Sequence, residues 1–566
     1  MADPSARLAA IADPYWERRL RDTPVFATSI GDRRYDDCLA DISPEGRAAV
    51  LEHRQTVLAE TQTIAEDDLE GNNRITRSAL LTEVQSEIDD LRCNVEDWIV
   101  DPLAGPQVGF LNIESFQPVR SFQEAHAMVR RWQAMAPRLD DHVANLTRGL
   151  AAGKVAVRTA VEKVIDELED LDRKPDAEWA LLRPLGVPHE DWTDAQRAEF
   201  RELLTESVRD RVRPAFRRYL EFLRTRVLAN ARPPERAGIM HLPGGTEDYG
   251  RLIRVYTALD LDPDDVHAIG MREVARINGE MEALGEKVFG VRERQRILKR
   301  LRTDTGLYFG LREEVAAKAE QAVARAKAAI PRFFGRLPKA DCEVVRMGEH
   351  EEKHSTIAYY RQPAADGSRP GRYYINTSAP ETRPRYEAEA LAYHEAIPGH
   401  HLQIAISQEL EGIPAFRKHL GVTAFVEGWG LYSERLADEM GLYSSDLDRM
   451  GMMSYDAWRA CRLVVDTGMH AKGWSRQRAI DFMKENSALA ENNIVNEVDR
   501  YIAWPAQALA YKTGQLEILR IREDARGRLG DRFDIRKFHD AVLENGAVAL
   551  GTLREAVEAY VVRAGG

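Results

Sequence analysis

The stretch His394-Glu395-Ala396-Ile397-Pro398-Gly399-His400-His401 places three imidazoles and one carboxylate within eight residues. Zinc favours imidazole nitrogen and carboxylate oxygen as ligands, and a Glu beside a ligating His can activate a water held by the metal. The stretch is therefore a candidate for part of a catalytic zinc site. A further ligand has to come from elsewhere in the chain.

The spacing of these His residues requires a broken helix. In a regular helix, His394 would lie about 9 Å from His400 and about 10.5 Å from His401 along the axis. Zn–N bonds of about 2.0–2.1 Å cannot span that separation. Pro398 has no N–H to donate, and Gly399 tolerates almost any backbone conformation. We therefore predict that two residues bulge out and return His400 to the face of His394, with His401 as the alternative second ligand.

The later segment 423–434 offers the third ligand. Glu427 stands in an apolar setting, and Gly428 and Gly430 permit close packing against a neighbouring helix. A buried carboxylate needs a partner, and a metal ion is a suitable one. Glu434 lies two turns further along the same face, where it can orient a ligating imidazole. The alternative is that the His residues pack a helix junction and that Glu427 forms a structural ion pair.

The composition limits the classes of partner and the compartment. Of 566 residues, 79 are Lys or Arg and 92 are Asp or Glu, which gives a net charge of −13. Nucleic acids and anionic membranes favour clustered basic residues, so neither is expected as a partner. The cysteines are scattered without a C-x-x-C pair, and the N-terminus has no leader-like stretch. No run of about 18 apolar residues occurs. These features predict a cytoplasmic protein.

The periodicity of the chain predicts a mainly α fold in two lobes. Apolar residues recur every three or four positions over 75–99 and 191–229. Pro and Gly residues concentrate at 231–247, which marks a boundary. We expect an N-terminal helical lobe over 1–235 and a C-terminal catalytic lobe with the metal-binding helices over 236–566.

One region departs from the helical pattern just before the His-rich stretch. Short runs at 343–347, 355–361 and 372–376 are rich in β-branched and aromatic residues. They predict a small antiparallel sheet within 341–377, beside the active site.

Three longer motifs resemble one known family. They are YHEAIPGHHLQ (393–403), FVEGWGLYSE (425–434) and RYIAWPAQALAYKTGQ (500–515). Together they resemble the bacterial family called domain of unknown function 885, which looks like a set of gluzincin-type zinc peptidases. The resemblance extends over nearly the whole chain.

The resemblance implies roles for individual residues and an architecture. His394 and His400 match the two His ligands of gluzincins, Glu427 the downstream Glu ligand, and Glu395 the catalytic Glu. The motif departs from H-E-x-x-H by two added residues. The implied architecture is helical and two-lobed, as in thimet oligopeptidase or carboxypeptidase Taq, with a deep channel between the lobes.

A hydrolase of this type also needs a donor to stabilise the oxyanion. Tyr511 is the first choice, and His470 is a second. Arg459 and Arg462 could hold a substrate carboxylate. Each of these side chains could have a structural role instead, because aromatic residues also pack helix pairs and arginines also form surface ion pairs.

These features predict a zinc-dependent hydrolase, namely a peptidase of short peptides with Glu395 as general base. One alternative is hydrolysis of a non-peptide amide or ester at the same site. Another is a non-catalytic helical binding protein with a structural His cluster, and iron or manganese could replace zinc. The sequence does not give the substrate length, the choice between exopeptidase and endopeptidase, or the oligomeric state.

Overall fold

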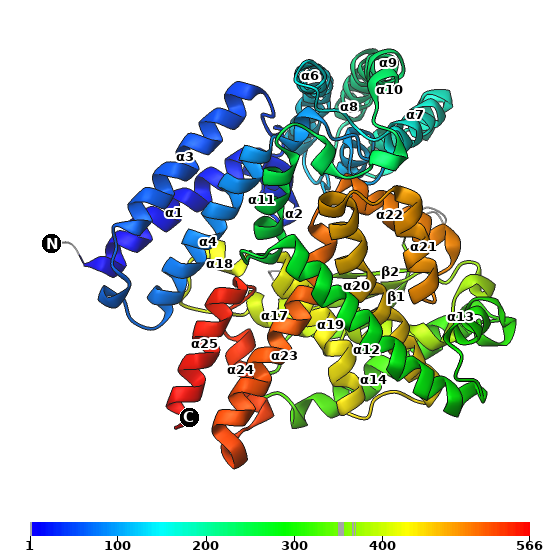
Figure 1. Cartoon of the computed structure of the whole chain (residues 1–566). Helices are drawn as coiled ribbons and strands as arrows, with labels where there is room; N and C mark the ends of the chain where they lie inside the picture. The colour runs from blue at the N-terminus through cyan, green and yellow to red at the C-terminus, as the bar shows by residue number, and fades with distance from the viewer. Residues whose placement is uncertain (1–2, 349–351, 353–355, 365–366, 368, 566) are drawn as a thin grey trace.

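The computed structural model describes residues 3–565, apart from 349–351, 353–355, 365–366 and 368, and it is mainly helical (Figure 1). The prediction of a mainly α fold is therefore confirmed. The helices before the sheet are α1 (Pro4–Asp22), α2 (Pro24–Ser29), α3 (Pro44–Gln62), α4 (Asn72–Cys93), α5 (Pro106–Asn112), α6 (Phe122–Ala151), α7 (Arg158–Arg173), α8 (Asp194–Glu206), α9 (Arg213–Phe222), α10 (Leu228–Asn230), α11 (Gly245–Thr257), α12 (Pro263–Phe289), α13 (Arg294–Thr303) and α14 (Arg312–Ala329).

The helices after the sheet carry most of the residues singled out above. They are α16 (Ala388–Glu395), α17 (His400–Gln408), α18 (Ala415–Lys418), α19 (Thr423–Glu439), α20 (Asp446–Lys472), α21 (Arg476–Asn486), α22 (Glu491–Ala503), α23 (Ala510–Leu529), α24 (Ile535–Leu543) and α25 (Leu550–Arg563).

The segment 191–229 shows how local chemistry sets the helix bounds. Thr193 and Gln196 exchange side-chain and backbone hydrogen bonds, and this capping box begins α8. A π-helical turn over Ser207–Val212 interrupts the α-helical pattern just before Pro214. Proline has no N–H for the carbonyl one turn earlier, so the regular bonding pattern cannot continue through it.

The hydrophobic cores join distant parts of the chain. Leu80 of α4 belongs to the same buried cluster as Phe425 of α19 and Val542 of α24. Figure 1 shows the C-terminal helices (orange to red) close to the N-terminal ones (blue), and α25 contacts α4. Residues 100–231 contribute a separate core. One core thus ends near the predicted boundary at 235, although the first helices pack with the last. The two-lobe division stays a prediction.

The sheet contains three strands, β1 (Cys342–Arg346), β2 (Ala358–Arg361) and β3 (Gly371–Ile375), in the order β1-β3-β2. Strand β2 pairs antiparallel with β3, whereas β1 pairs parallel with β3. The prediction of an antiparallel sheet was therefore wrong, because the sheet is mixed. Strands β1 and β2 lie at opposite edges of β3, and periodicity within a strand carries no information about that order.

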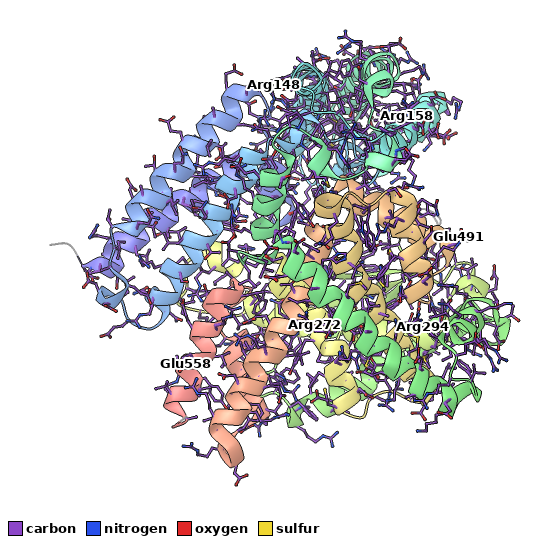
Figure 2. All side chains as sticks on the ribbon, viewed as in Figure 1. Arg148, Arg158, Arg272, Arg294, Glu491 and Glu558 are labelled. Atoms are coloured by element: carbon purple, nitrogen blue, oxygen red, sulfur yellow. The ribbon has the colours of Figure 1, made fainter. Side chains whose placement is uncertain are left out.

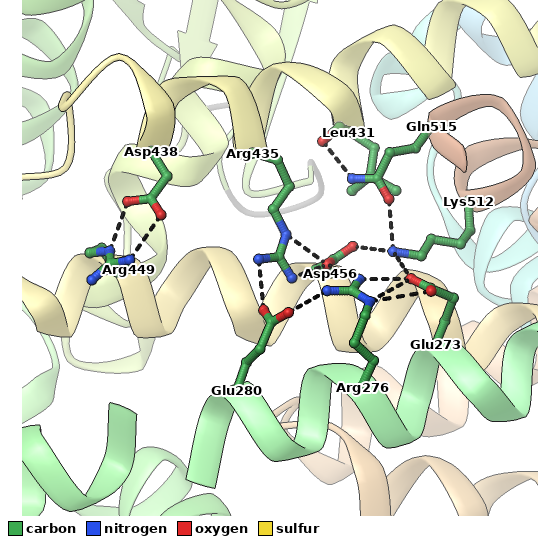
Figure 3. A network of polar contacts seen from close by, with 10 residues as sticks. All are labelled: Glu273, Arg276, Glu280, Leu431, Arg435, Asp438, Arg449, Asp456, Lys512 and Gln515. Atoms are coloured by element: carbon green, nitrogen blue, oxygen red, sulfur yellow. Dashed lines mark hydrogen bonds and ion pairs between the residues drawn. The ribbon is translucent and has the colours of Figure 1, made fainter. Parts of the chain in front are cut away.

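A buried network of charged side chains fixes the helices around the site (Figure 3). The Nζ atom of Lys512, on α23, lies 2.6 Å from Asp456 of α20 and 3.1 Å from Glu273 of α12. Arg435 of α19 also contacts Asp456, at 2.6 Å. Lys512 and Asp456 are essentially unexposed, so each charge depends on the others for compensation. The network ties four helices together.

Charged side chains of both signs cover the outside of the molecule, with Arg272, Glu491 and Glu558 among the exposed ones (Figure 2). None of the helices within the described ranges is both long enough and apolar enough to cross a membrane.

Candidate metal centre

The helix break predicted at Pro398 and Gly399 is present. Helix α16 ends at Glu395 and α17 begins at His400. A Cβ atom on Gly399 would lie 1.9 Å from the carbonyl oxygen of His394, so only glycine fits this close approach. The carbonyl of Pro398 accepts a hydrogen bond from Nε1 of Trp429, on α19, at 3.0 Å. Helix α19 therefore holds the bulge in place.

The bulge brings two imidazoles to one carboxylate. The Nε2 atoms of His394 and His400 lie 3.6 and 3.7 Å from Oε2 of Glu427. Ligands about 2.0–2.1 Å from a tetrahedral zinc lie about 3.4 Å from one another. The three ligand atoms lie within 4.8 Å of one another, and no second group of this kind is found in the described part of the chain. The spacing and the types of donor atom fit one zinc ion.

Glu434 sets the orientation of the first imidazole. Its Oε1 atom lies 2.8 Å from Nδ1 of His394, so Nδ1–H donates to the carboxylate and Nε2 is directed toward Glu427. Gly430 makes room for the ring, because a Cβ atom there would lie 2.7 Å from it. Glu427, Gly430 and Glu434 all belong to α19, at spacings that keep them near one face.

His401 is turned away from this cluster. Its Nε2–H donates to the carbonyl of Ala340 at 3.1 Å, and its Nδ1 lies 2.9 Å from the hydroxyl of Tyr360. Both ring nitrogens are therefore engaged in contacts that join α17 to strand β2 and to the residues before β1. Of the two alternatives for the second ligand, the structure brings His400 and not His401 beside Glu427. The Nδ1 atom of His400 is buried without a partner.

The neighbours of each candidate ligand shift its pKa and so decide which of the three groups is charged. Burial alone would lower the pKa of His394, but contacts with Glu427 and Glu434 outweigh burial and raise it to about 9. Burial and the neighbouring His394 lower the pKa of His400 to about 4. Burial would raise the pKa of Glu427, but the His394 contact and nearby positive charges lower it to about 2. The carboxylate thus stays ionised, as a metal ligand must.

Glu395 ends α16 next to the cluster. Burial raises the pKa of its carboxyl group to about 7, and the negative Glu427 adds to this shift. Helix α16 contacts strand β2, and the backbone N–H of Tyr360 acts on the carboxyl group in the opposite sense and lowers its pKa. Because Tyr360 lies on β2, the edge of the sheet stands directly beside Glu395.

Tyr511 lies close to the cluster on α23. Its ring centroid is 4.3 Å from the guanidinium carbon of Arg462, on α20, and the charge of Arg462 acts on Glu427. Tyr511 is only half-buried. The structure thus brings the first predicted oxyanion donor against Arg462, and its role stays a prediction.

His470, the second predicted donor, has other partners. The backbone N–H of Ile239 donates to its Nδ1 at 3.2 Å, and its Nε2–H donates to the carbonyl of Tyr501 at 3.0 Å. The side chain is fully buried. Neither nitrogen is therefore available to a substrate carbonyl in this conformation. Through these two hydrogen bonds, His470 links the backbone at Ile239 to the backbone at Tyr501.

Sequence reasoning missed two aromatic residues at the site. Trp429 and Ser433, one turn apart on α19, both donate to the carbonyl of Pro398. Their i,i+4 spacing on the helix of Glu427 was a usable signal. The ring of Trp458 contacts two arginine side chains of α20. Its position next to Arg459 was the only signal in the sequence for this contact.

Solved structures share this fold, whereas no curated protein matches the chain. A structure described as a "putative lipoprotein" from Colwellia psychrerythraea is 27% identical, with a TM-score of 0.90 and 100% of each chain covered. A structure described as a lipoprotein of unknown function from Shewanella oneidensis is 18% identical. It covers 97% of this chain and 99% of that chain, with a TM-score of 0.75, and shows the fold alone.

These descriptions contradict the predicted cytoplasmic location. Lipoproteins are secreted or anchored to a membrane by their lipid, and the relative that is 27% identical over the full chain is described as a "putative lipoprotein". The prediction depended on the lack of a leader-like stretch in the first residues. The description of a structural relative that covers the full chain outweighs that observation.

A family model matches residues 24–557, which is most of the chain. That match includes the helix break, the candidate ligands and the sheet. The chain therefore belongs to the family of bacterial proteins of unknown function DUF885.

Proposed function

We propose that this protein is a zinc-dependent hydrolase that cleaves short peptides, with Glu395 as its general base. The observation that carries the proposal is the convergence of His394, His400 and Glu427, whose ligand atoms lie within 4.8 Å of one another. Two imidazoles and one carboxylate are a ligand set of catalytic zinc sites, which leave a position open for water or substrate.

The sheet supports a peptide as substrate. Strand β2 pairs with β3 on one side only, so it is an edge strand. Its Tyr360 N–H contacts Glu395, which brings the edge next to the candidate base. Extended peptides bind proteins by adding a strand to such edges. A peptide bound along β2 therefore runs past the candidate metal centre.

In the proposed reaction, zinc bound at this centre supplies a Lewis acid that polarises the scissile carbonyl and acidifies water. Glu395 accepts a proton from the attacking water and delivers it to the leaving amine nitrogen. The hydroxyl of Tyr511 donates a hydrogen bond to the oxyanion. Glu434 keeps Nε2 of His394 directed at Glu427.

Metal analysis of the purified protein is the first test. We expect about one zinc per chain, and we expect His394→Ala to lose it. His126→Ala is the matched control, because His126 lies on α6 with 35% of its side chain exposed, and it should retain the metal. A chain that binds no divalent metal under any condition would make the non-catalytic binding protein the better description.

Turnover of a mixed peptide library is the second test. We expect cleavage by the zinc-loaded protein, and we expect Glu395→Gln to abolish cleavage while zinc stays bound. Full activity of Glu395→Gln would refute its role as general base. If peptides remain intact while amide or ester model compounds are cleaved, the bond attacked is not a peptide bond.

A further inference from the structure

Two arginines of α20 are buried near the candidate metal centre without a full set of partners. The side chains of Arg459 and Arg462 are 6% and 3% exposed. Arg459 makes no hydrogen bond to any described residue, and its Nε and Nη1 atoms are buried and unpartnered. The Nη1 atom of Arg462 is also buried without a partner. Buried donors without acceptors are costly, so each such group needs an explanation.

Aromatic rings hold both guanidinium groups in place. The guanidinium carbons of Arg459 and Arg462 lie 4.2 and 4.4 Å from the ring centroid of Trp458. Arg459 also lies over Tyr455, and Arg462 over Tyr511, at 4.5 and 4.3 Å. Stacking of this kind uses the flat face of a guanidinium and leaves the N–H groups at its edge for acceptors.

Few carboxylates contact these two arginines directly. Glu497 lies 3.1 Å from Arg462 but also 3.0 Å from Arg500, so one carboxylate serves two cations. The nearest carboxylate to Arg459 is Glu434, at 3.9 Å. Glu434 already accepts a hydrogen bond from His394. These contacts leave the Nε and Nη1 groups of Arg459 and the Nη1 group of Arg462 without an acceptor.

Both arginines stand within electrostatic reach of the reacting groups. The charge of Arg459 acts on Glu395 and on His400, and the charge of Arg462 acts on Glu427. Tyr511, the proposed oxyanion donor, lies against Arg462. Arg459 also lies 3.9 Å from Glu434, which contacts His394, so a ligand held by these two arginines lies close to the candidate metal centre.

We propose that Arg459 and Arg462, held by Trp458, bind a carboxylate of the substrate close to the scissile bond. The unpartnered N–H groups donate to the carboxylate oxygens, which removes the cost of leaving them unpaired. The carboxylate belongs either to the C-terminus of a short peptide or to an acidic side chain. This inference rests on the proposed function, because it specifies the substrate of that same site.

Binding to the inactive, zinc-loaded Glu395→Gln protein tests the inference without turnover. The ligands are short peptides of one sequence with a free C-terminal carboxylate or a C-terminal amide, each with and without a Glu side chain. We expect peptides with a carboxylate to bind about 10-fold or more tightly than the neutral peptide by calorimetry. A preference for the free C-terminus alone identifies a carboxypeptidase, and a preference for the Glu side chain identifies selection of acidic peptides.

Arginine variants show whether these residues cause the preference. We expect Arg459→Gln and Arg462→Gln to bring the affinity ratio between charged and neutral peptides close to one. Arg449→Gln is the matched control, because Arg449 lies on the same helix in ion pairs with Asp438 (Figure 3) and Asp446. It should keep the ratio. If a Gln variant does not fold, Arg459→Lys keeps the charge and should retain part of the preference.

The outcomes separate this inference from the proposed function. Equal affinity for charged and neutral peptides, or a preference that survives both Gln substitutions, overturns the inference even if zinc binds and peptides are cleaved. A purely structural role of the arginines would weaken all peptides equally and leave the ratio unchanged. Loss of zinc binding and turnover with a retained carboxylate preference would instead refute the hydrolase and leave a peptide-binding site.

Discussion

The Nδ1 atom of His394 lies 2.8 Å from Oε1 of Glu434, and this contact directs the opposite ring nitrogen at Glu427. Glu434 is completely buried, so its orientation is fixed by the packing of α19. A single helix thus supplies one candidate ligand and the residue that orients another.

We expect Glu434→Gln to weaken zinc binding about 10- to 100-fold without abolishing it, because the imidazole loses the negative partner that fixes its tautomer. Competition with a chelator of known affinity measures the change. Glu439→Gln is the control, since Glu439 lies on the same helix and pairs with Arg522 instead. Equal zinc affinity of the Glu434 variant and the wild type would contradict the orienting role.

Gly399→Ala should destabilise the protein by about 1–3 kcal/mol and reduce zinc binding, because the new Cβ atom collides with the backbone of α16. That atom would lie 1.9 Å from the carbonyl oxygen of His394. Thermal unfolding and metal content measure the two effects. Gly421→Ala, where no atom lies within 4 Å of the added Cβ, should change neither. Normal zinc binding by Gly399→Ala would show that the bulge tolerates a side chain.

Lys512→Met should cost about 3–5 kcal/mol, because it removes a buried cation that Asp456 and Glu273 share and leaves these carboxylates only their arginine contacts. Lys512 is completely buried, and its Nζ atom lies 2.6 Å from Asp456. Urea unfolding measures the loss. Lys472→Met removes an ion pair to Asp264, which is 77% exposed, and should cost about 1 kcal/mol or less. Similar losses for both variants would argue against a special role of the buried network.

Local chemistry made much of the candidate site predictable from the sequence. Pro398 and Gly399 required a helix break, and the periodicity of α19 required Glu427 and Glu434 to share a face. Both features follow from residues close together in the chain. The choice between His400 and His401 did not, because the partners of His401 are 41 and 61 positions away.

The order of the strands and the partners of His470 were not predictable from the sequence, for the same physical reason. The alternation of residues predicted the strands, but the edge of β3 that each strand joins depends on the connection between β1 and β2. His470 was a reasonable oxyanion donor by residue type. Its actual partners, Ile239 and Tyr501, lie 231 and 31 positions away, and no pattern near His470 indicates them.

The buried histidines predict how stability changes with pH. His539 is fully buried between the hydroxyl of Tyr432 and the carbonyl of Phe333, and burial lowers its pKa to about 3. In the unfolded chain the imidazole titrates near about 6.5. Below that pH the unfolded state binds a proton that the native state does not, so stability is fully present above about pH 6.5 and falls as the pH drops toward 3.

The expected loss from His539 is about 1.4 kcal/mol for each pH unit between these two values. His539→Gln cannot titrate, so the pH slope of its unfolding free energy between about pH 6 and 4.5 should be smaller than that of the wild type by this amount. His470→Gln should reduce the pH slope of the unfolding free energy in the same way, because burial also lowers the pKa of His470 to about 3. Urea unfolding at several pH values measures both slopes. Variants that lose stability with acid as steeply as the wild type would mean that these imidazoles become protonated within the native fold.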